Sequence, residues 1–280
     1  MDDEVVAILG GKGMLGTDLV ETCRQQGFDA RIFDLPEFDI SNAEQLKQAV
    51  NTAKAIVNCA AYTDVDGAER QPDLAYKVNA EAVGRLGILA AEEKLWVLHI
   101  GTDFVFDGKG DKPYVETDQP SPINEYGRTK LIGERLLVES GCDNCIMRIE
   151  WTYGRHGKNF VTKLLERAMS GNVLRVVDDQ IGSPTATTEV AKVICKLLRR
   201  KPQGIFHFAA DGYVSRYEMA KFAFSRLAMN VDIAPCKTSD YVMPAARPLN
   251  SRFDCSKIKA LLDEQIEHWQ GPLERFLRRL

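Results

Sequence analysis

Two residues with acid–base chemistry, Tyr126 and Lys130, stand four positions apart in a segment with a helical pattern. At this spacing both side chains lie on one face of a helix. A tyrosine hydroxyl has an ordinary pKa of about 10, so it transfers protons poorly at neutral pH. A nearby ammonium stabilises the phenolate, and we therefore expect Lys130 to lower the pKa of Tyr126. The spacing also occurs by chance, and the alternative is an exposed pair on a helix surface.

Thr102 supplies a hydroxyl that could act on the same substrate atom. It follows the apolar run at 96–100, where a strand is expected to end. We predict that the Thr102 hydroxyl donates a hydrogen bond to a substrate carbonyl. Tyr126 would give the carbonyl oxygen a proton while a hydride arrives at its carbon, and Lys130 would also hold the nicotinamide ribose. Thr102, Tyr126 and Lys130 are therefore the predicted catalytic residues.

A glycine-rich segment near the N-terminus predicts the source of the hydride. Three glycines spaced G-x-x-G-x-x-G connect a β-branched run at 5–9 to an amphipathic pattern at 14–26. Glycine there allows a tight turn and close approach of the backbone to a pyrophosphate, which the following helix N-terminus holds. No Gly-Lys-Ser/Thr follows, which excludes a Walker loop, and a simple turn is the alternative. The cofactor-binding residues predicted in this segment are Gly10, Gly13, Met14, Leu15 and Gly16.

The strand expected at 30–33 ends at Asp34, about where an acid would contact the adenosine ribose. A carboxylate there accepts a hydrogen bond from the 2′-hydroxyl and repels a 2′-phosphate, so the expected cofactor is NADH or NADPH, with NADH favoured. The alternative is that Asp34 only opens a turn before Pro36. The remaining predicted cofactor-binding residues are Asp39 and Ile40, beside the adenine, Ala60, Ala61 and Tyr62, after the strand expected at 55–59, and the catalytic pair Tyr126 and Lys130.

These residues need a scaffold in which strands and helices alternate. Apolar runs that are continuous, as in strands covered on both faces, stand at 5–9, 30–33, 55–59, 96–100 and 145–149. Helical patterns follow at 14–26, 74–93 and 125–139. Ser41 is the expected N-cap of a further helix, with Glu44 completing a capping box. The alternation predicts an α/β fold with a doubly wound parallel sheet.

After residue 150 the pattern loosens. Helices are expected at 159–170, 188–200 and 216–229, strands at 174–177 and 205–208, and an irregular segment at 234–251. We predict a dinucleotide-binding domain at 1–150. The segment 151–280 would form mostly a smaller substrate-binding lobe, with some segments returning to the first domain.

Composition excludes several classes of protein. The 36 basic and 40 acidic residues are mixed along the chain, which does not suit a nucleic-acid-binding surface. No secretory signal is visible at Met1–Glu4, and no apolar stretch approaches the roughly 20 residues of a membrane span. We expect a cytoplasmic protein whose seven cysteines are reduced. Cys142 and Cys145 lack the further ligands of a zinc site, so no metal site is predicted; buried thiols are favoured over a redox pair.

Taken together, these motifs resemble the dTDP-4-dehydrorhamnose reductase family, which belongs to the extended, atypical short-chain dehydrogenases. The resemblance covers nearly the whole chain. It rests on the glycine loop, the segments 60–66, 102–108, 126–130, 151–154 and 179–185, Ala68-Glu69, Val78-Asn79, Arg148, Asn159-Phe160, Arg247-Pro248 and Ser251.

The resemblance implies a Rossmann-type sheet and reduction of the C4 ketone of a dTDP-linked 4-keto-6-deoxy sugar, as in the step from dTDP-4-dehydrorhamnose to dTDP-rhamnose for cell-surface polysaccharide. It also implies a dTDP-sugar as the substrate partner, and it is compatible with a homodimer. Arg247 would pair with the diphosphate. The substrate-binding residues it implies are Thr63, Val65, Thr102, Phe104, Tyr126, Trp151 and Arg247.

Two residues depart from the family pattern. Gly101 stands where the family usually has serine, and Glu150 where it has a small residue. A carboxylate beside a dianionic ligand would repel it unless Glu150 points away or binds sugar hydroxyls, so the identity of the sugar stays open. The alternatives are a non-catalytic relative that binds a nucleotide or a partner enzyme, and another nucleotide-sugar reductase, epimerase or dehydratase. A dehydratase is disfavoured because Phe104, rather than a second acid, follows Asp103.

Overall fold

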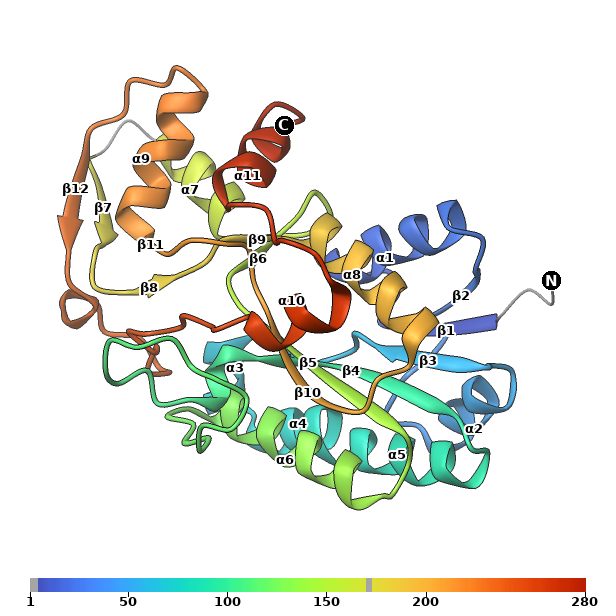
Figure 1. The fold of residues 1–280 in the computed structure, drawn as a ribbon. Helices are drawn as coiled ribbons and strands as arrows, with labels where there is room; N and C mark the ends of the chain where they lie inside the picture. Colours follow the sequence, from blue (N-terminus) through green and yellow to red (C-terminus); the bar gives the residue numbers. More distant parts are fainter. Residues whose placement is uncertain (1–4, 170–172) are drawn as a thin grey trace.

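Six strands of the described chain form a parallel sheet at the centre of the molecule (Figure 1). The computed structural model describes residues 5–169 and 173–280, so Met1–Glu4 and the end of the helix expected at 159–170 lie outside the described residues. The strand order is β10-β5-β4-β3-β1-β2. Their bounds are β1 Val5–Leu9, β2 Asp29–Phe33, β3 Ala55–Asn58, β4 Trp96–Thr102, β5 Asn144–Ile149 and β10 Gly204–Phe208. The predicted α/β fold with a parallel sheet is confirmed.

The sheet has a crevice where the strand order reverses. The chain runs from β1 outward to β2 and then returns to the other side of β1 with β3. Leu9 and Asn58 are register partners at the carboxyl ends of β1 and β3. Ligands of such sheets bind at this kind of reversal, beyond the carboxyl ends of the strands. The glycine loop begins one residue after Leu9.

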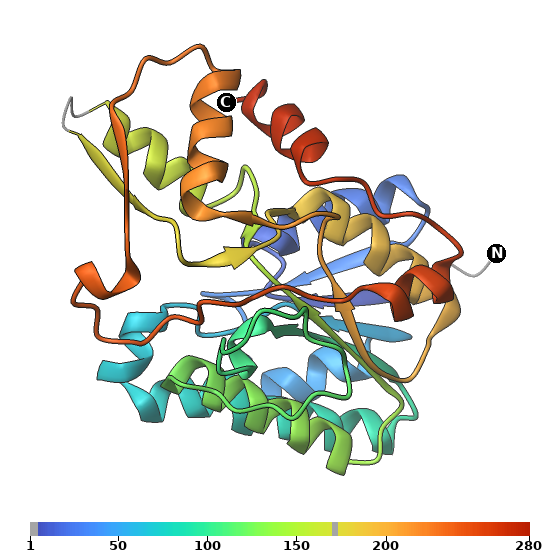
Figure 2. The same cartoon turned by 60° about the vertical axis from the view of Figure 1, so that its left-hand side comes forward.

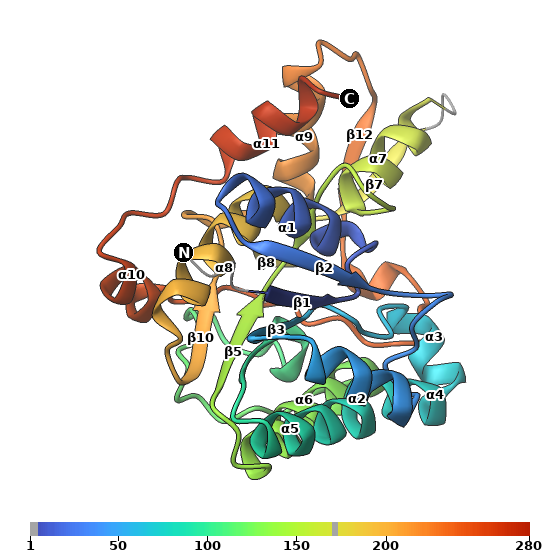
Figure 3. The same cartoon turned by 90° about the vertical axis from the view of Figure 1, so that its right-hand side faces the viewer.

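Helices cover both faces of the sheet (Figures 1 and 3). One face carries α1 (Met14–Gln25) and α8 (Thr187–Arg200), and the other carries α2 (Ala43–Asn51), α5 (Ala82–Glu92) and α6 (Glu125–Glu139). The strands alternate between two cores: Val6 and Ile8 pack on the α1 side, whereas Ala7 and Leu9 pack on the α5 side. Continuous apolar strands therefore identified a sheet that is buried on both faces.

Beyond residue 150, α8 and β10 return to the sheet, while most other elements form a layer of their own above the carboxyl ends of the strands (Figure 2). This layer has separate apolar clusters around Trp151, Met219 and Phe224. Its elements are β6 Thr152–Tyr153, α7 Phe160–Ala168, β7 Leu174–Val177, β8 Ile181–Gly182, β9 Thr185–Ala186, β11 Val214–Ser215, α9 Arg216–Arg226, β12 Ile233–Cys236, η3 Thr238–Asp240 and α11 Gln270–Leu277. The helix α10 (Ser256–Leu262) packs near β10. The boundary at residue 150 stays a prediction.

The helix expected at 74–93 is interrupted. Its parts are α4 (Pro72–Tyr76), the π-helical turn η1 (Lys77–Glu81) and α5. In η1 the Asn79 side chain hydrogen-bonds to the backbone N–H and C=O of Tyr62. The backbone carbonyl of Asn79 lies so close to α6 that a Cβ on Gly133 would meet its oxygen at 2.0 Å. A π turn at such a point fits the frequent use of these turns beside functional sites.

Two other local predictions were wrong, and two short helices were missed. The N-cap of α2 is Asn42 rather than Ser41, because the Asn42 side chain accepts hydrogen bonds from two N–H groups of the first turn. The segment 234–251 is not irregular throughout, since β12 pairs with β7 in parallel register. Two short helices, α3 (Val65–Arg70) and η2 (Asp103–Val105), were not anticipated. No helix in the described ranges is both long and apolar enough to cross a bilayer.

Candidate active site

A cavity of about 650 Å³ opens at the carboxyl ends of the strands and brings most of the predicted residues together. The predicted residues that line it are Gly10, Gly13, Met14, Leu15, Gly16, Asp34, Asp39, Ile40, Ala60, Ala61, Thr63, Val65, Thr102, Phe104, Tyr126, Lys130 and Trp151. Two predicted residues stand apart from it. Tyr62 turns its backbone toward Asn79, and Arg247 lines a second cavity instead.

The glycine loop is shaped by close backbone approaches. Gly10 has φ +76°, and a Cβ there would meet the Ala60 backbone nitrogen at 2.7 Å. A Cβ on Gly16 would meet the Gly10 carbonyl oxygen at 2.1 Å. Gly13 is the N-cap of α1 and supplies no side-chain cap. The uncapped helix N-terminus at the cavity wall is suited to an anion, so the residues fit the pyrophosphate of a dinucleotide.

Asp34 lies at the rim of the same cavity, directly after β2. Its carboxylate accepts hydrogen bonds from the backbone N–H groups of Lys12, at 2.7 Å, and Leu35, at 2.8 Å. These contacts fix the carboxylate against the glycine loop. Because Asp34 also bonds to Lys12 in the glycine loop, it does more than open a turn before Pro36. The expected preference for NADH stays a prediction.

Thr102 and Tyr126 face one another from different elements. Thr102 is the last residue of β4, and Tyr126 lies in the first turn of α6, which Asn124 caps. The Tyr126 ring packs edge-on against Phe104 at 5.4 Å between centroids. Burial, helped by the charges of Asp103 and Glu134 and opposed by a hydrogen bond with the Thr102 hydroxyl, raises the pKa of Tyr126 to about 12. The arrangement places two hydroxyls at one wall of the cavity.

Lys130 is buried one helical turn after Tyr126, but its ammonium is bound elsewhere. Its Nζ donates to the Ile100 carbonyl at 2.7 Å and lies 3.2 Å from His99 Nε2. Burial lowers the pKa of Lys130 to about 8. The ammonium is not among the groups that shift the pKa of Tyr126, which is raised rather than lowered. The expected lowering by Lys130 is therefore wrong for this structure, because desolvation dominates.

His99 is a residue of the site that the sequence analysis missed. It lies in β4, is fully buried, and connects Lys130 to Asn58, whose Nδ2 lies 3.1 Å from His99 Nδ1. Burial and the Lys130 charge hold the pKa of His99 well below its ordinary value, so the imidazole is neutral. A polar residue in the middle of the run Trp96–Ile100 was a signal that could have found it.

The two departures from the family pattern are both explained by packing. A Cβ on Gly101 would meet Glu134 Oε1 at 2.5 Å, so glycine makes room for the buried ion pair between Glu134 and Arg148, at 2.7 Å. Glu150 accepts hydrogen bonds from the backbone N–H groups of Ser183, at 2.9 Å, and Phe253, at 3.2 Å. Its carboxylate therefore bonds to backbone in the seam beneath the second layer and does not line the cavity.

A second cavity, of about 530 Å³, lies in the layer formed after residue 150. Among the described residues that line it, one acid, Asp66, faces five basic side chains. These are Lys163, Arg167, Arg175, Arg216 and Arg247. Arg247 donates to Asp66, at 2.9 Å, and to the Ala245 carbonyl, so part of its charge is neutralised. The net positive lining suits an anionic ligand.

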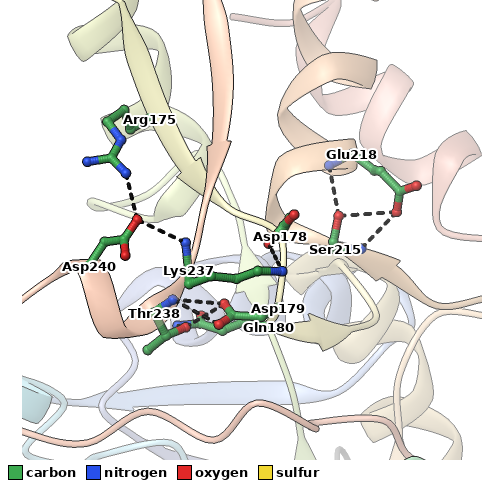
Figure 4. A network of polar contacts seen from close by, with 9 residues as sticks. All are labelled: Arg175, Asp178, Asp179, Gln180, Ser215, Glu218, Lys237, Thr238 and Asp240. Carbon is green, nitrogen blue, oxygen red and sulfur yellow. Dashed lines mark hydrogen bonds and ion pairs between the residues drawn. The ribbon is translucent and has the colours of Figure 1, made fainter.

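Polar contacts brace one wall of this second cavity (Figure 4). Asp179 accepts hydrogen bonds from the Thr238 backbone N–H at 2.9 Å and from the Thr238 hydroxyl at 2.7 Å. Gln180 donates to the same hydroxyl, and Lys237 pairs with Asp178 at 2.9 Å. These contacts tie the segment after β7 to the segment after β12, so the wall is held by side chains distant in sequence.

The described part of the chain contains no cluster of three His, Cys, Asp or Glu side chains that could hold a metal ion. Cys142 and Cys145 are free thiols and are both buried. They pack in different cores, Cys145 on the α1 side of the sheet and Cys142 on the α5 side.

Known proteins resemble the chain over its whole length. The family model described as RmlD substrate binding domain matches residues 4–280. The dTDP-4-dehydrorhamnose reductase of Aggregatibacter actinomycetemcomitans is 35% identical, over 95% of this chain and 96% of that protein. The Escherichia coli enzyme of the same name is 34% identical, over 98% and 97% of the two chains.

A solved structure agrees with these relatives. The dTDP-4-dehydrorhamnose reductase of Bacillus anthracis, crystallised in complex with NADP, superposes with a TM-score of 0.95 at 35% identity. The match covers 99% of this chain and 100% of that one. The chain therefore belongs to the RmlD substrate binding domain family, whose relatives named here are dTDP-4-dehydrorhamnose reductases.

Proposed function

We propose that this protein is an NAD(P)H-dependent reductase of the C4 ketone of a dTDP-linked 4-keto-6-deoxy sugar, acting in nucleotide-sugar and polysaccharide biosynthesis. The observation that carries the proposal is that Thr102 and Tyr126 stand in a cavity that meets both the glycine loop and the basic second cavity. Such a site suits a ketone presented between a dinucleotide and an anionic nucleotide. The names of the relatives above agree with this substrate class.

The cofactor-binding residues in this proposal are the glycine loop, Asp34, Asp39, Ile40 and the segment 60–62. Gly10 and Gly16 leave a cradle that a side chain would fill, and the uncapped N-terminus of α1 would hold the pyrophosphate. The bound nicotinamide supplies a hydride. NADP in the B. anthracis relative supports a nicotinamide dinucleotide, while the preference for NADH rests on Asp34.

The proton comes from this chain. In the proposal Tyr126 donates its phenolic proton to the ketone oxygen, and the Thr102 hydroxyl orients that oxygen by a hydrogen bond. Lys130, held by His99 and Ile100 at the cavity wall, would hold the nicotinamide ribose. Phe104 and Trp151 close the substrate side, with Thr63 and Val65 nearby on the cavity wall. The homodimer and the cytoplasmic location stay predictions.

A reduction assay tests the proposal. The protein would be mixed with a dTDP-4-keto-6-deoxy sugar and NADH or NADPH, and the absorbance of the reduced nicotinamide followed. We expect consumption of the reduced cofactor by the wild type. Tyr126→Phe should lose about a hundredfold or more in kcat, as for removal of an acid–base group, while its affinity for NADH is retained. Undiminished turnover by this variant would exclude the mechanism, and no consumption by the wild type would exclude the function.

A further inference from the structure

Arg216 occupies a position that none of the sequence motifs singled out. It is the first residue of α9, directly after the N-cap Ser215. Only three described residues line both cavities, and they are Phe104, Trp151 and Arg216. Phe104 and Trp151 were predicted to bind substrate. Arg216 adds a positive charge at the junction where the two cavities meet.

Aromatic rings hold the guanidinium in place. Its Cζ lies 3.5 Å from the centroid of the Trp151 ring and 4.6 Å from that of Phe160. Arginine stacked in this way keeps its in-plane N–H groups available as donors. Within residues 5–169 and 173–280, no protein acceptor takes a hydrogen bond from the Arg216 guanidinium and no carboxylate lies within ion-pair distance of it, while its backbone N–H donates to the Gln180 carbonyl. Its donors therefore remain available to a ligand in either cavity.

The charge of Arg216 is retained although the residue is sequestered. Burial lowers its pKa to about 9, and the nearby acids Asp103 and Glu150 oppose that shift, so the guanidinium is protonated at neutral pH. Both acids have other partners. Asp103 accepts from the Ser251 hydroxyl at 2.5 Å, and Glu150 accepts from two backbone N–H groups. Neither acid therefore occupies the donors of the guanidinium.

The Trp151 ring, on which the Arg216 guanidinium stacks, is held in place by its surroundings. Trp151 has φ +46°, a left-handed conformation that costs free energy for a residue other than glycine. Its carbonyl accepts a hydrogen bond from the Thr185 N–H at 3.2 Å, and a Cβ on Gly182 would meet its ring at 2.7 Å. Surrounding contacts thus hold the indole where the guanidinium stacks on it. Strained backbone of this kind is concentrated at ligand-binding sites.

We propose that Arg216 binds the diphosphate of the sugar nucleotide at the junction of the two cavities. The inference rests on the proposed function: a sugar at Thr102 and Tyr126, and a nucleoside in the basic second cavity, must be joined through this junction. A diphosphate supplies the anionic oxygens that a guanidinium recognises. Arg247 is already paired with Asp66, whereas Arg216 lacks such a partner among the described residues.

The test compares the binding of dTDP and of thymidine, which lacks the diphosphate, by isothermal titration calorimetry. Arg216→Met and Arg216→Gln remove the charge, and each should weaken dTDP binding by about tenfold to a hundredfold, the range for a hydrogen bond to a charged group. Thymidine and NADH affinities should change by less than about twofold on the same reasoning. Arg216→Lys should recover part of the loss in dTDP affinity.

Arg226→Met is the matched control. Arg226 ends the same helix, stacks on Phe222 at 5.0 Å and is exposed away from both cavities, so this variant should bind dTDP like the wild type. Unchanged dTDP affinity in both charge-removing variants would overturn the inference. So would an equal loss for thymidine and dTDP, which would mean that Arg216 only packs. A wild type that binds NADH but not dTDP would instead overturn the proposed function.

Discussion

The two cavities are built by different means. The first is shaped mainly by backbone: glycines of one seven-residue segment, an uncapped helix N-terminus and the carboxyl ends of neighbouring strands. The second is shaped by charged side chains from segments far apart in the sequence, such as Asp66, Lys163, Arg216 and Arg247. A backbone cradle depends on local spacing, whereas a side-chain cradle exists only after the chain has folded.

The two cavities also differ in the groups that they offer to an anionic ligand. The glycine loop offers backbone dipoles, which carry no titratable group. The second cavity offers guanidinium and ammonium groups, some of them partly neutralised, as Arg247 is by Asp66. We therefore expect substitutions in the glycine loop to act on cofactor binding alone, and substitutions of the basic residues of the second cavity to act on binding of the substrate nucleotide.

The largest effect is expected from the glycine loop. A Cβ at residue 16 would lie 2.1 Å from the Gly10 carbonyl oxygen, so Gly16→Ala must distort the loop. We expect NADH affinity to fall by about a hundredfold, equivalent to roughly 3 kcal/mol. Fluorescence titration with NADH measures it, and calorimetry with dTDP should show no change.

Gly13→Ala provides the control for that experiment. Its Cβ would meet the Gly10 carbonyl oxygen at 3.2 Å, a contact that a small adjustment relieves. NADH binding should therefore weaken much less than in Gly16→Ala. If both variants lost dTDP affinity together with NADH affinity, the two cavities would not be separable and the comparison would be broken.

A smaller effect is expected at His99, on the pH dependence of the reaction. The pKa of Lys130 is about 8, so its charged form is present below that pH and is lost as the pH rises through it. We expect kcat/KM, which reports the free enzyme, to fall above about pH 8. His99→Leu replaces the polar imidazole that lies 3.2 Å from the Lys130 ammonium with an apolar side chain, which should lower the pKa of Lys130 and move this fall to lower pH. A pH series of kcat/KM measures the shift.

His207 offers a matched control for the pH series. It is also a fully buried histidine, with a pKa lowered to about 3 by burial, but it bonds to the Tyr114 carbonyl instead of Lys130. His207→Leu should leave the pH of the fall unchanged. Identical profiles for the wild type and His99→Leu would show that His99 only packs in the core.

The smallest effect is expected at Asp34, which we predict to favour NADH over NADPH. Asp34→Asn keeps an oxygen for the Lys12 N–H and removes the charge that would repel a 2′-phosphate. We expect the wild type to prefer NADH, and the ratio of kcat/KM for NADPH to that for NADH to rise by about fivefold in the variant, an exposed charge effect near 1 kcal/mol. Steady-state kinetics with each cofactor measure it. A strong preference of the wild type for NADPH would contradict the prediction.

Much of the fold could be predicted because its signals are local. Continuous apolar runs identified all six strands of the sheet, and the helix at 125–139 was predicted to the residue. The errors occurred where a local pattern had two solutions. Ser41 and Asn42 can both cap a helix, and the apolar pattern at 74–93 does not show that Asn79 must turn inward through a π turn.

The candidate site divides in the same way. The loop Gly10–Gly16 and the spacing of Tyr126 and Lys130 are legible in the sequence. The partners of Lys130 are not, because His99 stands 31 positions before it in the chain and meets it only in the folded protein. The sequence left open whether the Glu150 carboxylate faces the ligand. The structure shows that it accepts hydrogen bonds from the backbone N–H groups of Ser183 and Phe253 instead.

The sequence by itself determined the parallel sheet, the dinucleotide cradle and the three residues proposed for the chemistry, because each depends on spacing within one or two elements. Only the tertiary structure decided that Lys130 rests on His99, that Arg247 is paired with Asp66, and that Arg216 stands at the junction of two cavities. Those facts depend on desolvation and on contacts between distant segments. Desolvation and contacts between distant segments arise only once the chain has folded.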